Sequence, residues 1–162
     1  MLKFFRIISI LLLIGWAIMI FCLSAETAET SSKTSGGFVA AIINILFPDY
    51  ENLSVAEQLA LSEQLQFIIR KTAHFTIYAI LGALSFLSVV TYKKTPFFCR
   101  LALSSAFCLL YAVSDELHQL AVAGRSGEVR DVLIDFCGAL LGIAFFTLLT
   151  KVLKFKFIKK YT

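Results

Sequence analysis

Charged residues are scarce in this chain. Asp, Glu, Lys and Arg together make up 16% of its 162 residues, whereas 59% of the residues are hydrophobic. Soluble domains usually carry about 25% charged residues, so the composition excludes an ordinary soluble domain. The mean hydropathy of +0.84 instead indicates a single integral membrane domain over residues 1–162, since we see no internal repeat or domain boundary.

Cysteine is also sparse, and its spacing excludes two kinds of site. The four cysteines are scattered through apolar stretches without a CxxC pair: Cys22, Cys99, Cys108 and Cys137. Neither a disulfide framework nor a cysteine-based zinc site is therefore expected. We interpret these residues as small apolar side chains of the protein interior.

Long hydrophobic runs are what the chain has in abundance. A helix needs about 20 residues to cross about 30 Å of hydrocarbon, and four stretches are long enough: 4–23, 72–92, 97–117 and 132–150. The sequence therefore predicts an all-α polytopic membrane protein. We expect a four-helix transmembrane bundle with an outer amphipathic helical segment, 24–70, between the first and second spans.

The first span has some features of a secretory signal peptide. Lys3 and Arg6 precede the apolar run, and Leu23-Ser24-Ala25 follows it. The run over residues 7–23 is longer than the 7–15 residues usual for the core of a signal peptide. We therefore expect this span to be retained as a membrane anchor.

Basic residues predict the orientation, because short loops rich in Lys and Arg stay in the cytoplasm. Ten of them flank one side of the spans, at positions 3, 6, 93, 94, 100, 151, 154, 156, 159 and 160, whereas all eleven acidic residues fall at or beyond the other side. Both termini are thus expected in the cytoplasm. The basic tail 151–162 suits anionic membrane lipids, and because no bases are interleaved with aromatics we predict no nucleic-acid partner.

The outer segment contains three recognisable parts. The Ser/Thr/Glu-rich stretch 24–35, with Gly36 and Gly37 after it, predicts a loop, and residues 38–47 predict a short helix that ends before Pro48. Ser54 and Glu57 form a capping box. This box predicts an amphipathic helix that either continues into the second span or bends near residues 70–71.

Polar residues cluster at the outer ends of three spans. Lys71, His74 and Tyr78 share one face of the second span, because they are spaced i, i+3 and i+7. Placing an ionisable side chain in hydrocarbon costs roughly 2.5–3.5 kcal/mol on insertion scales. Such a cluster therefore predicts a ligand-binding site, formed by Lys71, His74, Tyr78, Asp115, Glu116, Gln119, Arg125, Asp131 and Asp135.

The connection between the third and fourth spans contributes Arg125, which is flanked by Gly124 and Gly127. This short glycine-bearing connection allows Arg125 to fold back over the outer mouth of the bundle. Its guanidinium then either pairs with the helix carboxylates or holds a phosphate or carboxylate ligand in a bidentate manner. In the fourth span, the GxxxG motif of Gly138 and Gly142 predicts a close contact with another helix.

Several blocks of the sequence closely resemble the VanZ-like family. They are RKTAHFTIY at 70–78, SDELHQ at 114–119, GRSG at 124–127 and DVLID at 131–135, and Ser24 with its neighbours resembles the family's first outer segment. The resemblance implies a small multi-pass protein of the bacterial cytoplasmic membrane, typically in Gram-positive organisms. The founding member is associated with resistance to teicoplanin and related lipoglycopeptides, which implies a role in the cell envelope.

Three hypotheses for the polar cluster remain open. In the first, the polar groups only pair with one another across helices and stabilise the bundle. In the second, they bind a lipid-linked cell-wall precursor or a glycopeptide-related ligand, with Lys71 and Arg125 contacting its anionic groups.

In the third hypothesis, the protein is an enzyme that performs acid/base or metal-assisted chemistry on a phosphorylated lipid. The candidate catalytic residues are His74, Asp115 and Glu116, with His74 as a base oriented by a carboxylate. A divalent cation would be held by oxygen ligands. The candidates for that role are Asp115, Glu116, Asp131 and Asp135.

Overall fold

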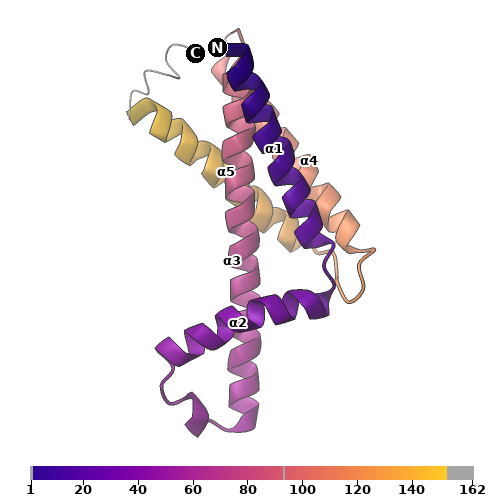
Figure 1. Cartoon of the computed structure of the whole chain (residues 1–162), viewed down its shortest axis with the longest axis vertical. Coiled ribbons are helices and arrows are strands. Elements are labelled where there is room, and N and C mark those ends of the chain that lie inside the picture. Colours follow the sequence, from indigo (N-terminus) through magenta and orange to yellow (C-terminus); the bar gives the residue numbers. More distant parts are fainter. Residues whose placement is uncertain (1, 93, 153–162) are drawn as a thin grey trace.

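A computed structural model of the chain describes residues 2–92 and 94–152, and all the regular secondary structure in that part is helical. Figure 1 shows the elements in chain order: α1 (Leu2–Ser24), α2 (Ala28–Leu46), the 3-10 helix η1 (Tyr50–Asn52), α3 (Val55–Val90), α4 (Phe97–Gln119) and α5 (Val129–Val152). The predicted all-α class is confirmed. Residues 153–162, most of the predicted basic tail, lie outside the described part.

Four of these helices are long and apolar enough to cross a membrane. They are the segments Lys3–Ser24, Val55–Val90, Phe97–Gln119 and Val129–Thr150. The chain is therefore a multi-pass membrane protein. The beginnings of α1 and α4 and the ends of α3 and α5 lie at one end of the bundle (Figure 1), as expected for an even number of crossings.

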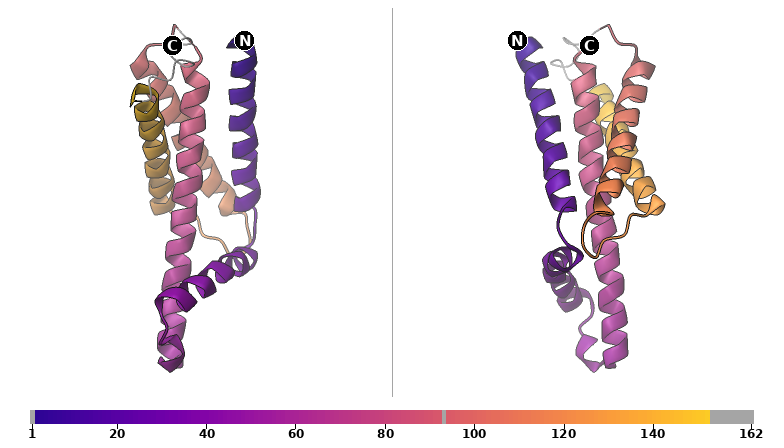
Figure 2. Two further views of the ribbon diagram at one scale, coloured as in Figure 1. Left: turned by 60° about the vertical axis from the view of Figure 1, so that its left-hand side comes forward. Right: turned by 90° about the vertical axis from the view of Figure 1, so that its right-hand side faces the viewer.

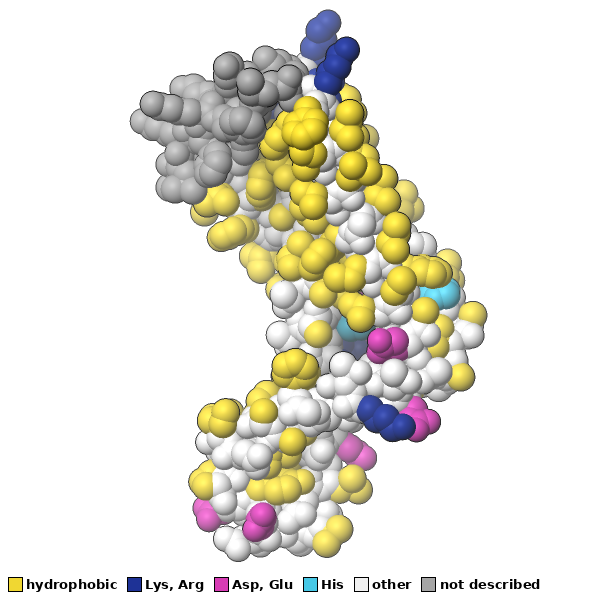
Figure 3. Space-filling model, in the orientation of Figure 1, with side chains coloured by type: hydrophobic (Ala, Val, Ile, Leu, Met, Phe, Trp, Pro, Cys, Tyr) yellow, Lys and Arg dark blue, Asp and Glu magenta, His cyan; other side chains and the backbone are white. Residues whose placement is uncertain are grey.

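The exterior of the bundle is apolar, as contact with lipid requires. Large hydrophobic side chains are exposed on several helices, among them Leu11, Phe98, Leu110 and Phe145. Figure 3 shows hydrophobic side chains covering the half of the visible face that contains the first residues of α1. The acidic side chains visible on this face lie in the other half.

Helix α3 is a single uninterrupted helix of 36 residues, about 54 Å long at 1.5 Å per residue. It begins at the predicted capping box, in which Ser54 and Glu57 exchange hydrogen bonds. No bend interrupts the helix at Arg70 and Lys71. Because α3 is longer than a membrane span needs, its first turns extend beyond the other spans, where α2 crosses it (Figures 1 and 2).

The predicted loop over residues 24–35 is wrong, because α2 begins at Ala28 and runs through both glycines. Thr27 caps its first turn by accepting a hydrogen bond from the Thr30 N–H, and Glu29 pairs with Lys33 one turn later at 2.7 Å. Composition suggested a loop, but the buried face of the helix packs against α3 and overrides weak helix propensity. The predicted short helix is only the second half of α2.

Glycines bring α3 and α5 into very close contact. A Cβ atom on Gly138 would lie 2.2 Å from the Phe75 carbonyl oxygen, and one on Gly142 would lie 1.7 Å from that of Ala79. On α3, a Cβ on Gly82 would lie 2.1 Å from the Ala139 oxygen. The predicted GxxxG contact is confirmed, and it determines how closely the polar residues of these two helices approach each other.

Candidate functional site

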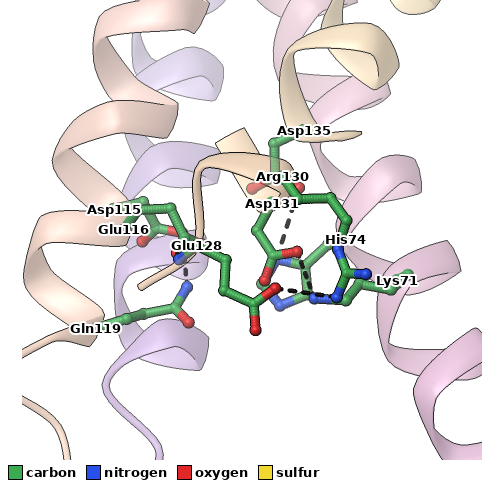
Figure 4. Close-up of polar contacts among 9 residues, drawn as sticks. All are labelled: Lys71, His74, Asp115, Glu116, Gln119, Glu128, Arg130, Asp131 and Asp135. Atoms are coloured by element: carbon green, nitrogen blue, oxygen red, sulfur yellow. Dashed lines mark hydrogen bonds and ion pairs between the residues drawn. The ribbon is translucent and has the colours of Figure 1, made fainter. Parts of the chain in front are cut away.

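Three helices bring polar side chains together away from the end where α1 begins. Lys71, His74 and Tyr78 lie on α3, whereas Asp115, Glu116 and Gln119 lie on the last turns of α4. Figure 4 shows most of these side chains with Asp131 and Asp135 from the first turns of α5. Arg125 reaches the same region from the α4–α5 connection. All nine predicted site residues thus lie in one part of the molecule.

The most buried part of this region is the His–Asp–Asp cluster, formed by His74, Asp115 and Asp135. One nitrogen or carboxylate oxygen from each residue lies within 4.8 Å of those of the other two. Asp135 is 0% exposed and Asp115 is 3% exposed. The His74 Nδ1 and Asp135 Oδ1 atoms are 3.7 Å apart, which is too long for a hydrogen bond.

Several atoms of this cluster have no hydrogen-bond partner among the described residues. They are both oxygens of Asp135, Oδ1 of Asp115 and Nδ1 of His74. Tyr78 is also fully buried, and its hydroxyl lies near the Asp115 and Asp135 carboxylates. Buried polar groups are usually satisfied, so ordered water, an ion or a ligand is expected to pair with these atoms.

The other oxygen of Asp115 is well supported. The Ser24 hydroxyl donates to Asp115 Oδ2 at 2.9 Å, and the Gln119 amide donates to the same atom at 3.4 Å. Ser24 is the last residue of α1, so this bond connects α1 to the end of α4. We did not predict Ser24 as a site residue, although it belongs to the family-like outer motif.

Glu116 and Asp131 do not join the cluster but make other contacts. Glu116 Oε2 accepts a hydrogen bond from the Glu128 N–H at 3.0 Å, just before α5 begins. Asp131 forms an ion pair with Lys71. The four-carboxylate metal set suggested by the sequence is therefore not assembled as such, since His74 takes the place of Glu116 and Asp131.

A charged cavity of about 130 Å³ adjoins the cluster. Its walls carry three basic residues, Arg70, Lys71 and Arg125, and two acidic ones, Glu128 and Asp131, besides His74. Gly124, whose φ of 74° is unfavourable for other residues, forms the turn that leads into Arg125. The folded-back side chain donates from Nε to the Glu26 carbonyl oxygen at 3.2 Å.

Arg125 lacks a carboxylate partner of its own in the described ion pairs. Burial, together with repulsion from Arg70, lowers the pKa of its guanidinium below the ordinary value. The side chain nevertheless stays protonated, because arginine does not lose its proton in proteins. The cavity therefore contains positive charge that an anionic ligand would stabilise.

A second cavity, of about 190 Å³, lies beside the first and is mostly apolar. Its walls include Leu23, Phe38 and Ile77 from α1, α2 and α3. Arg70, His74 and Arg125 line both cavities. A ligand with an apolar part and an anionic part could therefore contact both cavities through the same three side chains. Arg70 is a further residue that the sequence did not single out.

Comparison with known proteins agrees with the resemblance seen in the sequence. The model of the VanZ/LLP1 family matches residues 9–150, which includes α2, all of the polar region and most of each span. No curated protein and no solved structure matches the chain significantly. The functional roles of the nine site residues stay predictions.

Proposed function

The chain belongs to the VanZ/LLP1 family, and on this basis we propose that it binds an anionic, lipid-linked cell-wall ligand at the bacterial cytoplasmic membrane. In this role the protein acts in the cell envelope of a Gram-positive organism. It lowers susceptibility to teicoplanin-type lipoglycopeptides by altering what is displayed at the membrane surface.

The distribution of charge supports an outward-facing site. Lys3, Arg6, Lys94 and Arg100 lie at the end of the bundle opposite the site, and basic residues next to spans favour the cytoplasmic side. Both termini are then cytoplasmic, and the two cavities open toward the cell wall. Lipoglycopeptides and their lipid-linked targets meet the membrane on that same side.

The observation that carries the proposal is the sharing of Arg70, His74 and Arg125 by a charged and an apolar cavity. A phosphate or pyrophosphate next to a hydrocarbon chain matches this arrangement. Guanidinium groups bind phosphate through paired hydrogen bonds. The chain would lie against the apolar walls, and Lys71, which already pairs with Asp131, would add positive charge at the rim.

A second candidate function is supported by the position of His74. Its side chain lines both cavities, and its Nδ1 atom faces the Asp135 carboxylate at 3.7 Å. When a bound ligand draws His74 and Asp135 to hydrogen-bond distance, the carboxylate would orient the histidine so that its other nitrogen can accept a proton. His74 would then act as a base in hydrolysis or transfer of the lipid-linked phosphate.

Binding can be tested with the purified protein in nanodiscs, using a polyprenyl pyrophosphate and the polyprenol of equal length as probes. Charge-assisted hydrogen bonds contribute roughly 1.5–3 kcal/mol each, so Arg125→Ala should weaken pyrophosphate binding by at least about tenfold. Lys33→Ala, which removes an exposed cation of α2, should leave binding unchanged. Equal affinity for the pyrophosphate and the polyprenol would contradict the proposal.

Catalysis and resistance need separate measurements. Release of inorganic phosphate from the bound probe, lost in His74→Gln, would favour the enzyme over the binding protein.

The role in resistance is tested in a sensitive Gram-positive host that expresses wild-type or Asp115→Asn protein. The measurement is the susceptibility of this host to teicoplanin. If the wild-type protein accumulates in the membrane and susceptibility stays the same, the resistance role is wrong.

A further inference from the structure

The His–Asp–Asp cluster has more negative charge and more unpaired ligand atoms than an anion-binding site requires. We propose that His74, Asp115 and Asp135 together bind one divalent transition-metal ion of the zinc or manganese class. This inference does not depend on the proposed lipid ligand, because it concerns the buried floor of the polar region and not the basic walls of the cavities.

The spacing of the donor atoms fits a shared ion. Ligand atoms of a tetrahedral ion with bonds of about 2.0–2.2 Å lie about 3.3–3.6 Å apart. His74 Nδ1 and Asp135 Oδ1, at 3.7 Å, are close to this separation. One donor atom from each of the three residues lies within 4.8 Å of the others, so the side chains need to move slightly closer to share one ion. A hydrogen bond between histidine and aspartate would instead bring the two atoms to about 2.7–3.2 Å.

The unpaired atoms point to the same conclusion independently. Asp135 is completely buried, yet neither of its oxygens has a hydrogen-bond partner in the described part of the chain. The fully buried hydroxyl of Tyr78 lies near the same two carboxylates. Buried carboxylates are stable only when a charge or donors compensate them, and a bound cation would provide that charge.

The lysine and arginine side chains nearby do not provide this charge. Lys71 pairs with Asp131, and Arg125 donates to a backbone carbonyl. Within residues 2–92 and 94–152, neither forms an ion pair with Asp115 or Asp135. Two carboxylates and a neutral histidine carry two negative charges, which one divalent cation balances.

Asp115 is oriented as a metal ligand usually is. Ser24 and Gln119 both donate to its Oδ2 atom, whereas Oδ1 has no partner. Hydrogen bonds from outer residues commonly fix a ligating carboxylate and leave its other oxygen for the metal. Ser24 and Gln119 are therefore positioning residues, which act on the metal through Asp115.

The chemistry of the donors indicates the class of metal. Magnesium and calcium prefer sites made of oxygen atoms only, whereas a histidine nitrogen suits zinc and other transition metals, and carboxylates suit manganese. Three protein ligands leave a fourth position open. Since His74 lines the charged cavity, the open position would be accessible to an anionic group bound there.

The test uses the full chain in detergent, freed of metal with a chelator and then titrated with Zn²⁺, Mn²⁺ or Mg²⁺ alone. Bound metal per chain and the thermal unfolding temperature are the two readouts. We expect one equivalent of Zn²⁺ or Mn²⁺ and a higher unfolding temperature for wild type. Asp135→Asn and His74→Gln should bind at least tenfold more weakly.

Glu63→Gln is the matched control, because it removes an exposed carboxylate of α3 that lies about three turns before His74 and outside the cluster. It should bind metal as wild type does. No stoichiometric metal in wild type, or equal affinities for wild type and Asp135→Asn, would overturn the proposal. If Asp135→Asn does not fold, electron paramagnetic resonance of Mn²⁺ bound to wild type replaces the variant. A signal without coupling to an imidazole nitrogen would also overturn the proposal.

Discussion

His74 on α3 and Asp135 on α5 face each other at 3.7 Å between Nδ1 and Oδ1, next to the point where the two backbones almost touch. Phe75, the neighbour of His74, has its carbonyl oxygen against Gly138, less than one turn after Asp135. The glycine contact therefore holds these two polar side chains at a short and defined separation. Changes at the glycines and changes at the polar cluster should consequently affect each other.

Gly138→Ala tests the close helix contact. The added Cβ would lie 2.2 Å from the Phe75 carbonyl oxygen, so α3 and α5 must separate. Overpacking of this kind costs about 1–3 kcal/mol, and a lower unfolding temperature in detergent should reveal it. Gly36→Ala is the control, because a Cβ there meets nothing within 4 Å and should leave stability unchanged or raise it by up to about 1 kcal/mol. Equal effects at the two sites would contradict the contact.

Asp135→Asn should raise the free energy of unfolding without metal and reduce the further stabilisation that metal gives. In chelator the substitution removes an unpaired buried charge while keeping the shape of the side chain. The free energy of unfolding should rise by about 1–3 kcal/mol. At a metal concentration 100 times the wild-type dissociation constant, wild type gains about 2.7 kcal/mol, and a variant that binds tenfold more weakly or worse gains about 1.4 kcal/mol at most. Thermal unfolding with and without Zn²⁺ measures both effects, and a variant stabilised by Zn²⁺ as much as wild type would contradict this prediction.

Ser24→Ala should weaken the support of Asp115 from α1. The lost hydrogen bond, 2.9 Å long and buried, contributes about 0.5–1.5 kcal/mol to stability. Loss of such outer support lowers metal affinity by about 10–100-fold, which metal titration can measure. Ser114→Ala removes a hydroxyl that only bonds the Tyr111 carbonyl on an exposed face. A Ser24→Ala variant that behaves like this control would show that Ser24 does not position Asp115.

The Lys71–Asp131 ion pair should be energetically coupled. Both side chains are mostly buried, with 22% and 15% of their surfaces exposed, so either one alone would be left poorly compensated. We expect Lys71→Met and Asp131→Asn each to lower the unfolding temperature. The double variant should lose less than the sum of the two, with a coupling energy of about 0.5–3 kcal/mol. If the losses of stability in the two single variants simply add up in the double variant, the ion pair contributes no interaction energy to the stability of the protein.

The membrane spans and the general location of the site could be predicted because both follow from local patterns. Apolar runs of about 20 residues indicate spans, and helical spacing places Lys71, His74 and Tyr78 on one face. The helix over residues 28–37 could not be predicted in this way, since Ser, Thr and Gly favour loops by composition. Only the cap at Thr27 and the packing on α3 make that segment helical.

The sequence also could not predict which carboxylates lie next to His74. Helical periodicity gives the face on which Asp131 and Asp135 lie, but not the rotation of α5 relative to α3. That rotation depends on Gly138 and Gly142, whose partners, Phe75 and Ala79, are known only from the structure. Glu116 looked equivalent to Asp115 for the same reason, although it binds the Glu128 backbone instead.

The glycine contacts place the backbones of α3 and α5 so close together that the two helices have almost no room to move toward each other. Because the two backbones already touch, they cannot move closer together, so His74 and Asp135 must reach a shared ion by rotation of their side chains alone. The geometry around a bound ion would then be limited by three residues without side chains, which lie within about two turns of helix of His74 and Asp135.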